Sequence, residues 1–174
     1  MKPFIIGIGG AYRGVGKTTI ASLILGRLKG WGAIKYTKTA IYCSVTDDVS
    51  ILSIEGKDTS RLLNSGAEKV VWVKSPYENI AEILPLAIKN LSSQEGIVVE
   101  GNSAIEVLKP DIVIFLTGSE GDENKSSAEK IFRMADVIIY DKKPQSGIPE
   151  KVKGFSRDNI KECIEYVIGL IPKL

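Results

Sequence analysis

The sequence predicts an α/β fold of three layers, in which a mainly parallel central sheet carries helices on both faces. Short apolar segments alternate along the chain with longer segments of helical periodicity, and this alternation favours a parallel sheet covered on both sides. A chain of 174 residues is long enough for a full hydrophobic core. No repeat, low-complexity segment or linker divides it, so we expect a single domain over residues 1–174.

Strands and helices are expected in alternating order. The expected strands are residues 3–9, 33–38, 69–74, 96–100, 111–117 and 136–140. The expected helices are residues 17–29, 58–65, 76–91, 125–134 and 157–171. Three stretches lack clear periodicity and are expected to be loops, namely residues 39–56, 118–124 and 142–154.

Local patterns support individual elements. The first strand is apolar, and the helix after it places apolar side chains on one face, namely Ile20, Leu23, Ile24 and Leu28. Asp58 is expected to cap the amino end of the second helix. Pro85 lies inside the third helix and should bend it near Ala81 or split it in two. The last helix carries a core stripe of Ile160, Cys163, Ile164, Val167, Ile168 and Ile171.

The segment between the first strand and the first helix has the pattern of a phosphate-binding loop, or P-loop: Ala11-Tyr12-Arg13-Gly14-Val15-Gly16-Lys17-Thr18. Ala11 stands where the strict pattern has glycine, and it is a small residue and a common variant. In such a loop the backbone N–H groups face phosphate oxygens at the positive end of the helix dipole. Lys17 is expected to reach the β- and γ-phosphates, and the Thr18 hydroxyl to ligate Mg²⁺. The alternative is a glycine turn that only caps the helix.

We therefore expect a three-layer P-loop NTPase fold, with Mg²⁺ as cofactor and ATP or GTP as ligand. The expected nucleotide-binding residues of the loop are Tyr12, Arg13, Gly14, Val15, Gly16, Lys17, Thr18 and Thr19. Arg13 has the alternative of pointing to solvent. Many GTPases end a later strand with Asn-Lys-x-Asp, whose last Asp pairs with guanine. Here Asp141 and Lys142 follow the strand at 136–140 and are candidates for the base site, but Pro144 stands in place of the guanine-reading Asp.

Glu100 is the candidate acid of the site. It ends the apolar run Ile97-Val98-Val99, and in P-loop enzymes such an acid holds Mg²⁺ through water or orients the attacking water. We expect Glu100 to join Thr18 at the metal and to act with Lys17 in catalysis; the alternative is an acid that caps the strand end or pairs with a surface lysine. Asp111 begins a strand and is a weaker candidate. For Asp47 and Asp48, in the 39–56 loop, a solvated turn is favoured over a metal or substrate contact.

Four cationic residues are candidates for contact with an anionic substrate. They are Lys35, Lys38, Lys57 and Arg61. The first two flank the end of the second expected strand, and the other two flank the start of the second expected helix. Each has the alternative of an exposed side chain without a specific partner.

The composition excludes several classes of function. The chain has no histidine, which excludes His-based triads, imidazole bases and His metal sites. A net charge of +2 without a basic run argues against nucleic-acid binding. We see no signal peptide and no apolar stretch near the ~20 residues of a membrane span. Cys43 and Cys163 lie far apart without metal spacing, which suggests a reducing compartment, so we expect a cytoplasmic protein without membrane or nucleic-acid partners.

A second motif follows the 39–56 loop: Gly56-Lys57-Asp58-Thr59, then Arg61, then Ser65-Gly66-Ala67. Together with the P-loop it resembles the molybdopterin-guanine dinucleotide biosynthesis protein B family, which has Gly-Lys-Asp-Ser/Thr, an Arg and Ala-Gly-Ala at this spacing. That family's fourth strand ends in Glu-Gly, matched by Glu100-Gly101, and a Lys follows its second strand, matched by Lys35 or Lys38. The resemblance covers about the first hundred residues.

The chain departs from that family at two points. It lacks the histidines after the second strand, and Asn102-Ser103 replace the Phe-Lys that follows Glu-Gly. The chain is more distantly similar to the nickel-insertion GTPases of urease and hydrogenase maturation, through the P-loop and the run Ala135-Asp136-Val137-Ile138-Ile139. The Cys and His nickel ligands expected in those proteins are missing.

These observations predict a Mg²⁺-dependent nucleoside-triphosphate-binding protein with weak hydrolytic activity. The resemblance implies an accessory role in molybdenum-cofactor biosynthesis, with an enzyme of that pathway as partner and with oligomerisation open. One alternative is a P-loop small-molecule kinase or ligase, whose acceptor site would use the 39–56 loop with Lys35 and Lys38. The other is a non-catalytic adaptor that senses nucleotide. The choice between ATP and GTP also stays open.

Overall fold

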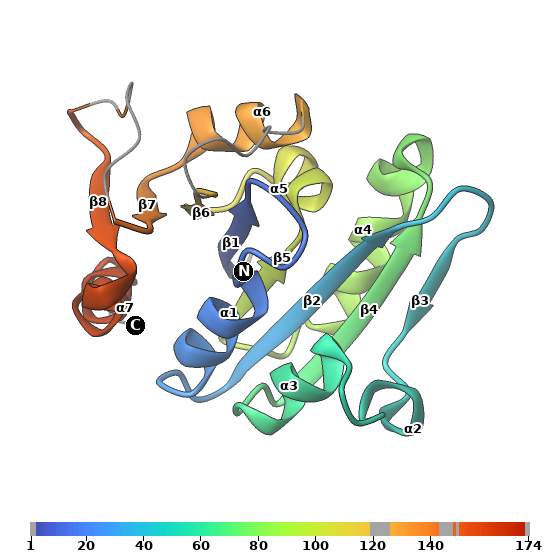
Figure 1. Ribbon diagram of the computed structural model, residues 1–174. Helices are drawn as coiled ribbons and strands as arrows, with labels where there is room; N and C mark the ends of the chain where they lie inside the picture. The colour runs from blue at the N-terminus through green and yellow to red at the C-terminus, as the bar shows by residue number, and fades with distance from the viewer. Residues whose placement is uncertain (1–2, 119–125, 143–147, 149, 173–174) are drawn as a thin grey trace.

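A computed structural model describes residues 3–118, 126–142, 148 and 150–172. Within these residues eight strands form one sheet in the order β3-β4-β2-β5-β1-β6-β7-β8 (Figure 1). Neighbouring strands are parallel except β3 and β4, which are antiparallel. The predicted α/β class with a mainly parallel sheet is confirmed.

Most of the expected strands and helices are present, and their observed bounds differ from the expected bounds by a few residues. The strands are β1 Phe4–Gly10, β2 Trp31–Lys38, β3 Ser44–Thr46, β4 Lys69–Ser75, β5 Gly96–Glu100, β6 Ile112–Leu116, β7 Val137–Tyr140 and β8 Lys153–Ser156. The α-helices are α1 Lys17–Leu25, α2 Val49–Leu52, α3 Asp58–Asn64, α4 Ile80–Asn90, α5 Asn102–Leu108, α6 Ser126–Met134 and α7 Ile160–Gly169. Two 3₁₀ turns, η1 Tyr77–Asn79 and η2 Arg157–Asn159, lead into α4 and α7.

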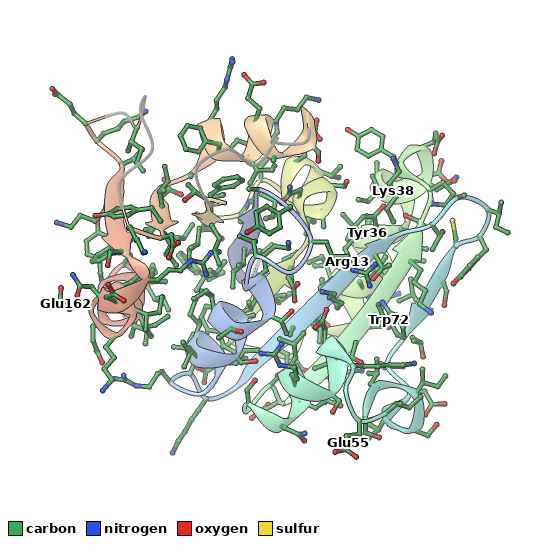
Figure 2. The ribbon with its side chains drawn as sticks, viewed as in Figure 1. Arg13, Tyr36, Lys38, Glu55, Trp72 and Glu162 are labelled. Atoms are coloured by element: carbon green, nitrogen blue, oxygen red, sulfur yellow. The ribbon has the colours of Figure 1, made fainter. Side chains whose placement is uncertain are left out.

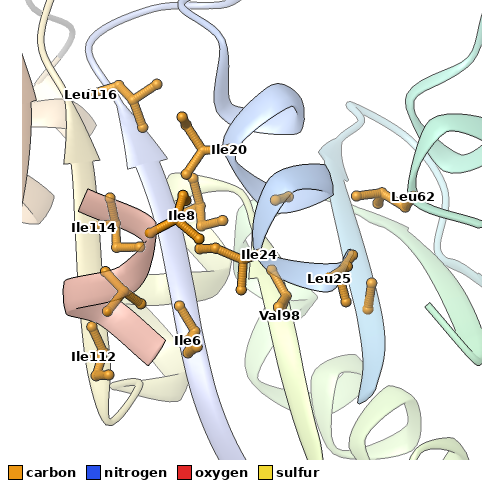
Figure 3. Packing of buried hydrophobic residues seen from close by; sticks show 14 of the residues in the cluster. Ile6, Ile8, Ile20, Ile24, Leu25, Leu62, Val98, Ile112, Ile114 and Leu116 are labelled. Carbon is orange, nitrogen blue, oxygen red and sulfur yellow. The ribbon is translucent and has the colours of Figure 1, made fainter. Parts of the chain in front are cut away.

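Both faces of the sheet are buried because successive side chains of each strand point to opposite sides. Ile6 and Ile8 of β1 pack in a cluster with side chains of α1, α3 and α7. Ile5, whose side chain points to the opposite face, packs in a second cluster with α4 and α5, and a third cluster joins α5 and α6 to β6 and β7. Figure 3 shows Ile6 and Ile8 between the side chains of β6 and those of α1. The core therefore has two layers, one on each face.

Two segments expected to be loops contain short elements. β3 and α2 lie within residues 39–56, and β8 begins within residues 142–154, at Lys153. β3 and β8 are the outermost strands of the sheet, each with one hydrogen-bonded neighbour. A three- or four-residue edge strand needs little apolar alternation, which is why periodicity did not reveal it. α5 was also not expected, because its seven residues are too few for a helical period to stand out. The expected loop at 118–124 lies, apart from Gly118, outside the described residues.

The predicted splitting of the helix at Pro85 is wrong, whereas the alternative, a bend near Ala81, stays a prediction. Pro85 lies inside α4, which continues from Ile80 to Asn90. Pro85 and Ala81 are both exposed, so the Ala81 carbonyl, which loses its partner at the proline, can bond to water. The change of helix type occurs earlier, where η1 gives way to α4 at Ile80. None of the helices in the described ranges has the length and apolarity that crossing a bilayer requires.

Candidate functional site

The predicted P-loop lies between the end of β1 and the start of α1. Gly14 and Gly16 have φ angles of 87° and 107°, which side chains other than glycine rarely adopt. The Val15 side chain is buried in the core beside α1 and anchors the loop from below. Lys17 Nζ donates a hydrogen bond to the Tyr12 carbonyl, 2.9 Å away, across the mouth of the loop. This strand, loop and helix arrangement is the one that the sequence motif requires.

Glu100 lies beside the loop because β5 is the neighbour of β1. Parallel pairing places Glu100 next to Ile8, two residues before β1 ends. The Thr18 hydroxyl donates a hydrogen bond to Glu100 Oε2 at 2.8 Å, and both side chains are buried. The loop hydroxyl and the strand-end acid, 82 positions apart in sequence, therefore meet.

Lys35 joins the same cluster from β2, on the other side of β5. It pairs in register with Glu100 across the sheet. Its Nζ lies 2.6 Å from Glu100 Oε1 and 2.6 Å from Asp58 Oδ2. The alternative that Glu100 pairs with a surface lysine does not describe this contact, since the side chain of Lys35 is only 15% exposed.

The predicted capping role of Asp58 is wrong. Asp58 is the first residue of α3, Lys57 occupies the cap position, and no side-chain hydrogen bond caps the helix. The Asp58 carboxylate accepts from Lys35 instead. Burial on its own would raise the pKa of Asp58, but the hydrogen bond and charge of Lys35, a contact with Thr18 and the charge of Arg61 lower that pKa below its ordinary value. The ionised form of Asp58 therefore belongs to the site.

The other predicted cations have different positions. Arg61 Nη2 donates to Thr19 Oγ1 at 3.0 Å, so Arg61 reaches the start of α1. Lys38 lies at the end of β2 with its Nζ 5.9 Å from the centre of the Tyr77 ring. Lys57 stacks over Trp72 at 5.2 Å from the ring centre and does not line the cavity described below.

The remaining acids are structural. Asp47 pairs with Lys69 at 2.8 Å, and Asp48 caps α2 by accepting from the Ser50 N–H, so the favoured solvated turn describes them. Asp111 accepts from the Ile5 N–H at 2.7 Å, near the amino end of β1 and away from the loop. None of the three lines the cavity.

A cavity of about 1190 Å³ connects the P-loop to the carboxyl ends of β2 and β5. Its lining includes Arg13, Lys17, Thr18, Thr19, Lys35, Lys38, Asp58, Arg61, Tyr77, Glu100, Ser103, Glu106 and Lys130. Figure 2 shows Arg13, from the loop, near Tyr36 and Lys38 at the end of β2, whereas Glu162 of α7 lies far from them. The volume exceeds the roughly 300–1,000 Å³ of common ligand sites. Asp141 and Lys142 are exposed after β7, outside this lining, so their role in base binding stays a prediction.

Two residues that hold the loop were not identified from the sequence. The Asn102 amide accepts from the Gly10 N–H and donates to the Gly10 carbonyl, each at 3.0 Å. Arg157 Nη2 donates to the Val15 carbonyl at 2.8 Å and to the Thr117 carbonyl at 3.4 Å. The sequence offered one sign for Asn102, because this residue stands where the molybdopterin-guanine dinucleotide biosynthesis protein B family has Phe after Glu-Gly. Arg157 had none, because the strand that precedes it, β8, was not expected.

A divalent cation in this site would need ligands from the protein, from the phosphates and from water. Across the described part of the chain, no group of three or more His, Cys, Asp and Glu side chains is placed to hold a metal. The Thr18 hydroxyl and the Glu100 carboxylate are hard oxygen donors, which suit Mg²⁺ bound jointly by protein, phosphate and water. The donor set therefore fits Mg²⁺.

The chain is similar to several solved structures. Hydrogenase maturation factor HypB from Archaeoglobus fulgidus superposes with a TM-score of 0.61 at 18% identity, covering 97% of this chain and 90% of that one. HypB from Helicobacter pylori in complex with nickel gives 0.60 at 14%, covering 97% and 86%. A plasmid partition protein from Borrelia burgdorferi gives 0.53 at 17%, covering 98% and 100%. No protein-family model matches the sequence, and no curated protein matches it.

These likenesses, with the geometry of the loop, define the class of protein: the chain has the P-loop NTPase fold. At such low identities they show the fold alone. Membership of the molybdopterin-guanine dinucleotide biosynthesis protein B family, which the motifs indicate, therefore stays a prediction.

Proposed function

We propose that the chain is a Mg²⁺-dependent nucleoside triphosphatase that binds ATP or GTP at the P-loop. The observation that carries this proposal is the 2.8 Å hydrogen bond between Thr18 Oγ1 and Glu100 Oε2, at the helix end of a glycine loop. It joins a loop hydroxyl to a buried acid beside the place where this motif binds β- and γ-phosphates. A loop that only capped α1 would not need a buried carboxylate there.

Catalysis in this proposal depends on positioning and charge, because phosphoryl transfer needs little covalent chemistry from the protein. The loop N–H groups and Lys17 hold the β- and γ-phosphates. Thr18 and Glu100 hold Mg²⁺, which when bound neutralises charge on the phosphate oxygens. Glu100 also orients the attacking water. Arg13 is exposed in the loop and lines the cavity, and it supplies further positive charge to the phosphates.

The resemblance supports an accessory role in molybdenum-cofactor biosynthesis. Asp58 of the Gly-Lys-Asp-Thr motif and Glu100 of the Glu-Gly motif contact the same Lys35 Nζ. Two motifs that the family carries at separate positions thus belong to one cluster in this chain. This is the pathway assignment that we favour, with a partner enzyme of that pathway.

A second function, a small-molecule kinase or ligase, is favoured by the extent of the cavity. The cavity continues past Lys35 to Lys38, Tyr77, Ser103 and Lys130. This part has room for an acceptor beside the γ-phosphate. Phosphate release measured with and without candidate acceptors, together with detection of a phosphorylated or ligated product, separates this function from simple hydrolysis.

The proposed function is tested by Lys17→Ala. Loss of a charged donor to phosphate should raise the nucleotide Kd at least about tenfold and leave the circular dichroism spectrum unchanged. Lys29→Ala, at an exposed lysine after α1, is the matched control and should bind as the wild type does. Equal affinity of wild type and Lys17→Ala for ATP and GTP would contradict a phosphate site at this loop.

A further inference from the structure

Lys35 occupies an unusual position between two carboxylates. Its Nζ lies 2.6 Å from Asp58 Oδ2 and 2.6 Å from Glu100 Oε1. The Glu100 side chain is 3% exposed and that of Lys35 is 15% exposed, so this pair is shielded from water. The ammonium neutralises a carboxylate that would otherwise be buried with an uncompensated charge.

The groups around the Lys35 ammonium are those that a divalent cation would use. Glu100 presents one oxygen to Lys35 and the other to the Thr18 hydroxyl. Asp58 and Glu100 meet at the Lys35 ammonium, since each accepts from Nζ at 2.6 Å. Two carboxylates that meet at one ammonium, with a hydroxyl bonded to one of them, are a hard-oxygen set that suits Mg²⁺. Asp58 is a member of this set that the P-loop motif does not include.

We propose that Lys35 is the resident cation of this two-carboxylate site and couples entry of Mg²⁺ to binding of the triphosphate. The inference rests on the proposed function, in that the triphosphate occupies the P-loop. While Lys35 bridges Asp58 and Glu100, a divalent cation cannot take both carboxylates without placing two cations side by side. The site therefore has little affinity for Mg²⁺ until the ammonium moves to another anion.

The terminal phosphate is the anion to which Lys35 moves. Lys35 lines the same cavity as Lys17 and Thr18, and its four-carbon stem is flexible. A γ-phosphate held by the loop supplies a new anionic partner for Lys35, and Mg²⁺ would neutralise the two carboxylates that Lys35 leaves. A diphosphate lacks this group, so Lys35 should favour triphosphate over diphosphate. The ligand class for which Lys35 selects is thus a nucleoside triphosphate bound with its metal.

The direct test measures Mn²⁺ binding without nucleotide, by electron paramagnetic resonance of free Mn²⁺. Lys35→Met should bind Mn²⁺ about tenfold or more tightly than the wild type, because both carboxylates become available. Lys29→Met is the matched control: it removes an exposed lysine that does not line this cavity, and it should behave as the wild type. Equal Mn²⁺ affinity of Lys35→Met and wild type would overturn the proposal.

A second pair of variants keeps the test decisive if Lys35→Met does not fold. Asp58→Asn with Lys35→Met removes one charge of each sign, so the net charge of the site is unchanged. It should bind Mn²⁺ more tightly than Asp58→Asn alone, in which Lys35 still covers Glu100. Equal affinities of these two variants would also refute the role of Lys35. These measurements contain no nucleotide, so they stand even if the wild type fails to bind ATP and GTP, which would reject the proposed function instead.

The nucleotide arm uses ADP and a non-hydrolysable ATP analogue, or the guanine pair, with Mg²⁺ present. Lys35→Met should reduce the wild-type preference for triphosphate over diphosphate by about tenfold, whereas Lys29→Met should preserve it. An unchanged preference in Lys35→Met would show that the ammonium stays with the carboxylates when nucleotide binds.

Discussion

The role of Glu100 depends on the two groups that share its carboxylate. One oxygen accepts from the Thr18 hydroxyl at 2.8 Å, and the other lies 2.6 Å from Lys35 Nζ. A buried carboxylate held in this way has a fixed orientation and needs its charge balanced. A substitution that removes the charge of Glu100 and keeps its shape should therefore disturb the site more than it disturbs the packing of the core.

Glu100→Gln should lower the rate of Mg²⁺-dependent hydrolysis at least about tenfold while nucleotide affinity changes less. Glutamine keeps the shape of the side chain, and the loop contacts to phosphate do not involve it. Turnover measured against Mg²⁺ concentration, alongside equilibrium binding, checks this. A variant with wild-type turnover at all Mg²⁺ concentrations would reduce Glu100 to a strand-end acid.

Asp58 should make the folded protein sensitive to acid. Its pKa is lowered in the folded state, so it contributes stability above its unfolded pKa of about 3.9, and that stability is lost as the pH falls through the folded value. The wild type should then lose more free energy of unfolding than Asp58→Asn as the pH is lowered from about 5 through the folded pKa of Asp58.

Urea unfolding at several pH values measures this difference. Asp141→Asn, at an exposed carboxylate after β7, is the control and should follow the wild type. Parallel pH curves for wild type and Asp58→Asn would show that the contact with Lys35 does not stabilise the fold.

At the scale of elements, the P-loop is held by parts of the chain far from it. α5 supplies Asn102, whose amide pairs with both backbone groups of Gly10, the last residue of β1. η2 supplies Arg157, which donates to the Val15 carbonyl. Because these contacts satisfy buried backbone groups next to the loop, they fix its conformation before a ligand arrives.

Asn102→Ala should lower the free energy of unfolding by about 2 kcal/mol, because it leaves the N–H and C=O of buried Gly10 without these partners. Nucleotide affinity should fall as well, since the loop then has to be ordered by the ligand. Asn90→Ala, at the exposed end of α4, is a suitable control. If the two variants unfold alike and bind alike, α5 does not support the loop.

At the scale of the whole molecule, the sheet order brings the acid strand between the loop strand and the lysine strand. β5 lies between β1 and β2, so the loop, Glu100 and Lys35 lie together near the carboxyl ends of these three neighbouring strands. The other half of the sheet, β6 to β8, includes the strand after which the nucleotide base is expected to bind. Asp141 lies there, exposed, and Pro144 lies outside the described residues.

ATP and GTP should bind within about tenfold of each other, or ~1.4 kcal/mol. A pocket built to hydrogen-bond a particular group rejects an analogue that lacks it, and this chain has Pro144 where guanine-specific proteins have Asp. Competition binding with the two nucleotides decides the question. A preference for GTP of about a hundredfold or more would show that another group, such as Asp141, reads guanine.

The sequence by itself determined the elements whose signals are local. The P-loop follows from eight consecutive residues between a strand and a helix, and the buried strands follow from their apolar composition. The fold class followed from the alternation of these elements. The edge strands β3 and β8 were not predicted, because a short strand with one neighbour shows little alternation of apolar and polar residues.

Only the tertiary structure decided which candidates act together. Lys35, Asp58 and Glu100 belong to three different elements, and no spacing in the chain relates them. Their contact depends on the order β2-β5-β1 and on where α3 begins. Lys57, one residue before Asp58, stacks on Trp72 instead. The alignment of strands in the sheet decides contacts of this kind. The hydrogen-bonded register, and not the distance along the sequence, sets which side chains lie next to one another.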